Sequence, residues 1–219
     1  MTVVNKIVFC TLLLGVSLIC PAQEISIRGG LNISHIPEKM VGDNFFDDPW
    51  LKPSFHFGPT ISFTITKSLA LETGVLYSSK GIRNKGKSGW DKETTYLEKL
   101  NLSYLEVPVN IKVKIFDRNL SLYGFGGGYF GYALFGNTYQ NPDISKDEVS
   151  RIRITWVKGM DYSMKRLDYG ANMGIEFNRN NSAIGINYLF GLTSLTYSSI
   201  SSYNRTLEIY FKYQLWSNY

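Results

Sequence analysis

Apolar and polar side chains alternate along most of the chain after residue 23. In residues 102–116, for example, Val109 and Ile111 alternate with Asn110 and Lys112. A period of two residues is typical of a β-strand whose two faces meet different surroundings. The pattern predicts eight strands, at residues 24–34, 54–66, 69–80, 102–116, 120–136, 166–178, 183–197 and 205–216.

The predicted connections between these strands alternate between short and long. The short ones are residues 66–68, 117–119 and 179–182, and the long ones are 35–53, 81–101, 137–165 and, somewhat shorter, 198–204. Tight turns at one rim and long loops at the other are typical of outer-membrane barrels. We therefore predict an all-β fold, a transmembrane up-and-down antiparallel β-barrel of about eight strands. The short turns and both termini are expected on the periplasmic side.

Three features interrupt the regular pattern. Glycines 126–128 make the facing of the fifth strand ambiguous, and we expect a bulge or bend there. Pro108 lies inside a strand although proline cannot donate a backbone hydrogen bond, so it is expected at a bulge or at the rim. Within the third long loop, residues 151–157 have an alternation of their own, which predicts a hairpin that continues beyond the membrane.

Charged residues of the predicted strands fall on the face opposite the aliphatic rows. An Arg or Lys that faces lipid costs about 2–4 kcal/mol at the bilayer midplane, so this face is expected to point into the lumen. Eight strands enclose only enough space for side chains, which predicts a polar network rather than a diffusion channel. The predicted network comprises Arg28, Glu72, Glu106, Lys112, Lys114, Asp168, Glu176, Glu208 and Lys212. The residues predicted for the aromatic girdles at the membrane interfaces are Tyr77, Tyr129, Tyr132, Tyr169, Tyr188, Tyr213 and Trp216.

The N-terminus has the features of a secretory signal peptide. Lys6 precedes an apolar run at residues 7–19, and small residues precede a predicted cleavage between Ala22 and Gln23. A lipoprotein signal ending at Cys20 is the alternative, but it requires a small residue where Ile19 stands. We thus predict two parts, a signal peptide at 1–22 and an outer-membrane β-barrel domain at 23–219.

Composition supports this reading and narrows the chemistry. Of the 219 residues, 44% are hydrophobic and 15% aromatic, which favours strands and interfacial girdles over helices. Both cysteines, Cys10 and Cys20, lie in the predicted signal peptide, so the mature chain is expected to have no disulfide or cysteine metal site. The net charge of +5 is dispersed, and neither a nucleic-acid partner nor a cofactor is expected.

Two sets of loop residues are candidates for chemistry at the long-loop rim. The first, a Ser-His-Asp set for a lipid A-modifying enzyme, consists of His35, His56, Ser54, Asp47 and Asp48. No nucleophile-elbow motif accompanies them, so we expect ordinary polar loop residues and no catalytic or metal site.

The second set forms a basic loop beside an aromatic residue. It consists of Arg83, Lys85, Lys87, Trp90 and Lys92. Such a loop can contact phosphates of lipopolysaccharide or a glycan, and the alternative is a solvated loop.

Two regions resemble the PorT-like family of outer-membrane β-barrel proteins. They are Tyr104 to Lys112, which reads YLEVPVNIK and is followed after a turn by LYGFGGGY at 122–129, and RGGLNIS at 28–34. The resemblance implies the barrel fold and an outer-membrane location. The name-giving member of that family is similar to parts of a secretion apparatus, which implies secretion-complex proteins as partners.

Three hypotheses follow for the function. The favoured one is a non-catalytic outer-membrane barrel with a structural, surface-interaction or secretion-assembly role. Its expected partners are outer-membrane lipid, lipopolysaccharide, the barrel assembly machinery and secretion-complex proteins. The alternatives are the lipid A-modifying enzyme and a soluble lipocalin-like ligand binder, which needs an apolar lumen and a polar exterior.

Overall fold

The computed structural model of the protein describes residues 23–35, 49–87, 95–141, 149–159, 163–197 and 202–218. The predicted signal peptide, including Ala22, lies outside these ranges, and Gln23 is the first residue of β1. No helix in these ranges is long and apolar enough to cross a membrane.

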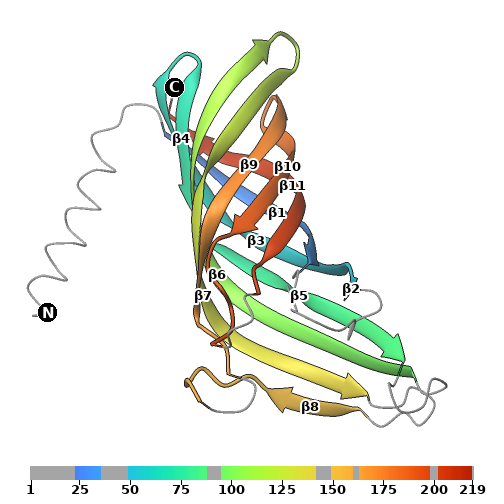
Figure 1. Ribbon diagram of the computed structural model, residues 1–219. Coiled ribbons are helices and arrows are strands. Elements are labelled where there is room, and N and C mark those ends of the chain that lie inside the picture. The colour runs from blue at the N-terminus through green and yellow to red at the C-terminus, as the bar shows by residue number, and fades with distance from the viewer. Residues whose placement is uncertain are drawn as a thin grey trace, which may run out of the picture.

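The strands form one closed antiparallel sheet, so the predicted all-β up-and-down barrel is confirmed (Figure 1). Strand β1 pairs with both β3 and β11, and the pairing of β6 with β7 closes the wall. Because β4 and β5 are successive parts of one strand position, the wall has eight positions. The strands are β1 Gln23–His35, β3 Lys52–Thr66, β4 Leu69–Gly74, β5 Leu76–Lys87, β6 Thr95–Asp117, β7 Ser121–Asn141, β9 Leu167–Arg179, β10 Ser182–Gly191 and β11 Arg205–Ser217, with short strands β2 Pro49–Trp50 and β8 Ser150–Arg153.

Tight turns join the strands at one end of the barrel, and the last described residues lie at the same end (Figure 1). Asn180 in the turn between β9 and β10 has a φ of 51°, a left-handed conformation that asparagine tolerates better than most residues. The amide of Asn218 donates to the carbonyl of Gln23 over 3.1 Å, so the two ends of the described barrel are side by side. An even number of strand positions accounts for this arrangement.

The break between β4 and β5 comes from two prolines in the neighbouring strands. Pro59 of β3 is opposite Val75 and Pro108 of β6 is opposite Gly74, and neither proline can donate a backbone hydrogen bond. The register against β6 is the same before and after the break. The prediction that Pro108 marks a bulge or the rim is therefore wrong: it pairs with Tyr129 in regular register in the middle of β6.

The bulge of the fifth predicted strand lies at Leu134, not at glycines 126–128. Tyr104 of β6 pairs with Ala133 and Ser103 pairs with Phe135, which leaves Leu134 as an extra residue, while the register across 126–128 is regular. The bulge turns two consecutive residues outward, because Leu134 and Phe135 are both exposed. Tyr129, predicted for a girdle, instead points into the barrel and is 1% exposed, so that prediction is wrong.

At the other end, strands continue where long loops were predicted. β5 and β6 pair as far as Lys87 and Thr95, and β6 and β7 pair as far as Leu97 and Asn141. Figure 1 shows these three strands leaving the barrel together, with β8 alongside β7. The loop prediction for 81–101 is thus wrong at its flanks, whereas the strand-like pattern near 151 does form β8. We call residues 79–87, 95–103 and 135–141 together with β8 the hairpin sheet.

The two faces of the wall differ sharply in polarity. The inward residues are mainly polar or charged and buried, and the outward residues are apolar and exposed. The outward set includes Ile27, Leu31, Phe55, Phe57, Val109, Ile111, Met173, Ile175, Ile186, Ile209 and Phe211. This is the inverse of the lipocalin-like arrangement.

Candidate functional site

Four charged side chains form a closed ionic cluster in the half of the lumen near the tight turns. Lys112 Nζ donates to Glu176 Oε1 over 2.6 Å and to Glu72 Oε2 over 3.1 Å. Lys212 Nζ donates to the same two oxygens, over 2.8 Å to Glu176 and 2.9 Å to Glu72. Each lysine therefore contacts both carboxylates, and the four charges sum to zero. We call these four residues the ionic square.

Tyr210 connects the ionic square to the next layer of the lumen. Its hydroxyl donates to Glu176 Oε2 over 2.8 Å, and the guanidinium of Arg28 lies 3.7 Å from its ring centroid. The ring lies over Gly185, where a Cβ would come within 2.3 Å of the Tyr210 ring. Only glycine at position 185 leaves room for this tyrosine to bridge the two layers.

The second layer is centred on the ion pair between Arg28 and Glu208. Arg28 Nη2 donates to Glu208 Oε2 over 2.6 Å, and Asn187 Nδ2 donates to the same oxygen over 2.9 Å. His56 Nδ1 lies 2.6 Å from Asn32 Oδ1, and Arg28 Nε donates to His56 Nε2 over 3.3 Å. A neutral imidazole with its proton on Nδ1 satisfies both of these contacts.

The third layer joins a second ion pair to a buried carboxylate. Lys80 pairs with Glu106, and its ammonium lies 4.5 Å from the ring centroid of Tyr129. Asn204 Nδ2 donates to Asp168 Oδ2 over 2.7 Å, and the hydroxyl of Tyr129 lies 3.4 Å from both oxygens of Asp168. Successive levels of the lumen are thus filled by ion pairs and hydrogen-bonded polar side chains.

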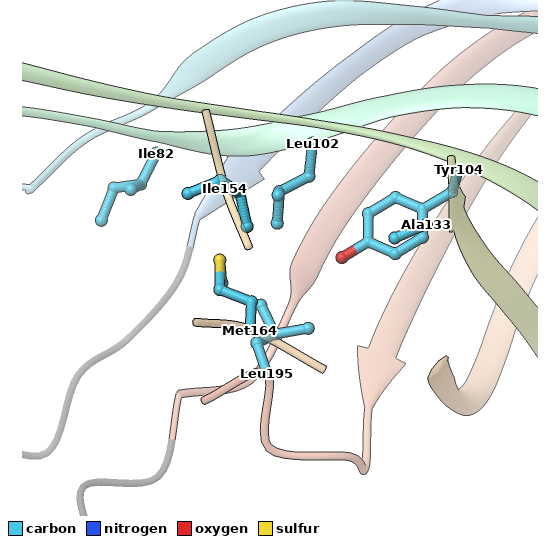
Figure 2. Packing of buried hydrophobic residues seen from close by; sticks show 7 residues of the cluster. All are labelled: Ile82, Leu102, Tyr104, Ala133, Ile154, Met164 and Leu195. Carbon is cyan, nitrogen blue, oxygen red and sulfur yellow. The ribbon is translucent and has the colours of Figure 1, made fainter. Parts of the chain in front are cut away.

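An apolar cluster lies at the hairpin-sheet end of the lumen, and Figure 2 shows how its side chains pack. Ile154 and Met164, from the segment after β8, and Leu195, after β10, pack against the wall residues. The amide of Lys165 donates to the carbonyl of Leu195 over 2.7 Å, which ties the two loop segments together. The cluster is made of Ile82, Leu102, Tyr104, Ala133, Ile154, Met164 and Leu195.

The structure buries eight of the nine residues predicted for the lumen network and places them in these layers. Lys114 differs, because its side chain is 25% exposed and pairs with Asp117 over 2.9 Å beside the tight turn. Hydrogen bonds from Ser121 and Lys114 hold the pKa of Asp117 below its usual value. The network also contains Lys80, which was not predicted from the sequence. Lys80 could have been found, because it is an even number of residues from Glu72 in the same predicted strand and so lies on the same face.

The residues considered for catalysis do not come together in the described parts of the chain. His56 is buried in the second layer, and the hydroxyl of Ser54 donates to the carbonyl of Ser79 over 2.6 Å. His35 is the last residue of β1 and lies three positions after Asn32, so it is on the face opposite to the lumen residues of that strand. Asp47 and Asp48 lie outside the described residues. The described residues also contain no group of three side chains arranged to hold a metal ion.

Only part of the predicted basic loop lies within the described residues, and that part belongs to strand β5. Arg83 is exposed on β5, and Lys85 and Lys87 lie farther along the same strand. Trp90 and Lys92 lie outside the described residues.

Several solved structures of outer-membrane proteins are similar to the chain. Ail, the attachment invasion locus protein of Yersinia pestis, has 14% identity to the chain and a TM-score of 0.44, with 89% of this chain and 99% of that chain covered. Neisserial surface protein A has 9% identity and a TM-score of 0.46 over 89% and 99% of the two chains. OprG of Pseudomonas aeruginosa has 11% identity and a TM-score of 0.39 over 89% and 97%. No curated protein matches the sequence.

The family model described as "outer membrane protein beta-barrel domain" matches residues 22–197, most of the chain. Its match agrees with the closed wall, the apolar exterior and the charged lumen described above. The chain therefore belongs to the outer membrane protein beta-barrel domain family and is a protein of the outer membrane.

Proposed function

We propose that this protein is a non-conducting, non-catalytic anchor in the outer membrane that presents the hairpin sheet at the cell surface. The proposal rests on two observations together: side chains fill the lumen, and the hairpin sheet extends past the end of the barrel. Glu72, Lys112, Glu176 and Lys212 are at most 4% exposed and bind one another. A solute path through this layer would require buried ion pairs to separate, which is costly.

The hairpin sheet is the surface best suited to interaction with a partner. It projects from a rigid wall, and loops carried on such scaffolds often supply binding residues. The PorT-like resemblance of residues 104–112 and 122–129 points to proteins of a secretion complex as one partner class. A lipid A-modifying activity is not favoured, because His56 is enclosed in the lumen away from the rim.

Planar-bilayer conductance tests the filled lumen. We expect the purified protein to give only baseline current, because buried side chains fill the successive layers of the lumen. A large porin in the same bilayers serves as the positive control. Sustained, ohmic single-channel openings of the folded protein would contradict the proposal.

Cysteine labelling tests which end faces the cell exterior. Residues 23–219 contain no cysteine, so single Arg83→Cys and Arg118→Cys variants each introduce one thiol. We expect a membrane-impermeant maleimide to label Arg83→Cys in intact cells, whereas Arg118→Cys, at the tight turns, is labelled only after lysis. The opposite pattern would place the hairpin sheet in the periplasm.

A further inference from the structure

Cations from separate strands lie in one row on the outward face of the hairpin sheet. Arg83 of β5 is opposite Lys99 of β6, Lys99 is opposite Tyr139 of β7, and Tyr139 is opposite Arg151 of β8. Residues directly opposite one another in a sheet project from the same face. The row therefore presents three cations and one aromatic ring, drawn from residues up to 68 positions apart in the chain.

A second row lies beside the first, nearer the barrel. Arg153 of β8 is opposite Asn137 of β7, and Arg151 Nε donates to Asn137 Oδ1 over 3.3 Å. The guanidinium of Arg151 lies 5.6 Å from the ring centroid of Tyr139. Together with Phe135, the residues Asn137, Arg151 and Arg153 line a surface hollow of about 340 Å³. We call Arg83, Lys99, Asn137, Tyr139, Arg151 and Arg153 the basic face.

The charges of the basic face are not balanced by the protein in its described parts. Like charges directly opposite each other, as Arg83 and Lys99 are, destabilise a sheet. The outward positions on the four strands of the hairpin sheet include no Asp or Glu. Among the described residues, no carboxylate pairs with Arg83, Lys99 or Arg153, whereas the lumen cations Arg28 and Lys80 each have one. An anionic ligand would offset this repulsion.

The position of the basic face indicates which kind of anion fits it. On β7, Tyr132, Leu134 and Phe135 point outward below it and are 41–46% exposed. From Phe135 to Tyr139 the strand rises about 13 Å, or about 10 Å along the membrane normal at the tilt of a barrel strand. Aromatic residues mark the membrane interface, so the arginines lie at the level of lipid headgroups.

We propose that the basic face binds the phosphate groups of a phosphorylated glycolipid of the outer leaflet, of the lipid A class. The fork of each arginine matches two phosphate oxygens, and Lys99 adds a point charge. The acyl chains of the lipid lie along Leu134, Phe135 and Tyr132 below. The proposal rests on the extracellular position of the hairpin sheet given in the proposed function.

Native mass spectrometry of the detergent-folded protein with added lipid A tests the site. We expect the variant Arg151→Ala/Arg153→Ala to bind lipid A about tenfold more weakly than the wild type, because two charge-assisted contacts are lost. The matched control is Arg118→Ala/Arg179→Ala, which removes the same charge from exposed residues at the tight turns. We expect this control to bind as the wild type does, and heat-modifiable migration on gels verifies that both variants fold.

Two further probes separate lipid phosphate from other sources of affinity. Dephosphorylated lipid A is expected to bind the wild type weakly. Its affinity should be about equal to that of phosphorylated lipid A for Arg151→Ala/Arg153→Ala. Inositol hexaphosphate, a soluble anion without acyl chains, is expected to compete poorly. Equal binding by both double variants, or equal affinity for hexaphosphate and lipid A, would overturn the proposal. Binding is measured on the isolated protein, so a failure here is distinct from a reversed labelling pattern in cells.

Discussion

Replacing Glu176 by alanine is expected to lower the free energy of unfolding by about 3–5 kcal/mol. The change leaves Lys112 and Lys212 sharing the single carboxylate of Glu72, and the hydroxyl of Tyr210 loses its acceptor. An uncompensated charge in a buried site costs far more than the pair contributes, because neither water nor a counter-charge can reach it. Denaturant unfolding of the protein folded into lipid vesicles measures the loss.

A second change in the same cluster distinguishes charge imbalance from lost packing. In Glu176→Ala/Lys212→Met the remaining pair, Lys112 and Glu72, is neutral again, so we expect the double variant to be more stable than Glu176→Ala. Lys114→Met removes a cation from the partly exposed pair with Asp117 and is expected to cost less than about 1 kcal/mol. If Glu176→Ala were no more destabilising than Lys114→Met, the ionic square would not be a buried unit.

Replacing Val109 by arginine is expected to destabilise the barrel by about 2–4 kcal/mol. Val109 lies in the middle of β6 on the outward face and is 43% exposed. An arginine there must reach through the hydrocarbon to the interface, since the wall offers it no inward route. Unfolding in vesicles with the same lipid composition measures the cost.

The matched control for this substitution is Asn101→Arg, on the same strand and the same outward face. Asn101 lies in the hairpin sheet opposite Asn137, beyond the aromatic residues of β7. Near or above the interface the cost of an arginine falls to about 0–1 kcal/mol. Equal destabilisation by both substitutions would show that the outward face at Val109 does not contact lipid.

Much of the barrel could be predicted from local pattern. The alternation of Val109 and Ile111 with Asn110 and Lys112 assigns the two faces of β6 without knowledge of its neighbours, because the period of a strand is two. The charges of Glu72, Glu176 and Lys212 lie on the inward face for the same reason. The tight turns likewise depend on a few adjacent residues.

The errors arose where distant residues decide the outcome. Pro108 lies in the middle of the wall beside a break in the neighbouring strand, where β4 ends at Gly74 and β5 begins at Leu76. The bulge falls at Leu134 because β7 must remain in register with β6 on both sides of it. Tyr129 points inward because that register carries it toward Lys80 and Asp168.

Local patterns in the sequence were enough to predict the fold class, the two faces of each strand and most of the charged residues in the lumen. These follow from period-two alternation and from the cost of placing charge in lipid, both of which act residue by residue. The folded barrel was needed to show which charges pair, and that Arg83, Lys99, Arg151 and Arg153 share one outward face. Neighbours on different strands depend on the inter-strand register, and closure of the whole barrel sets that register.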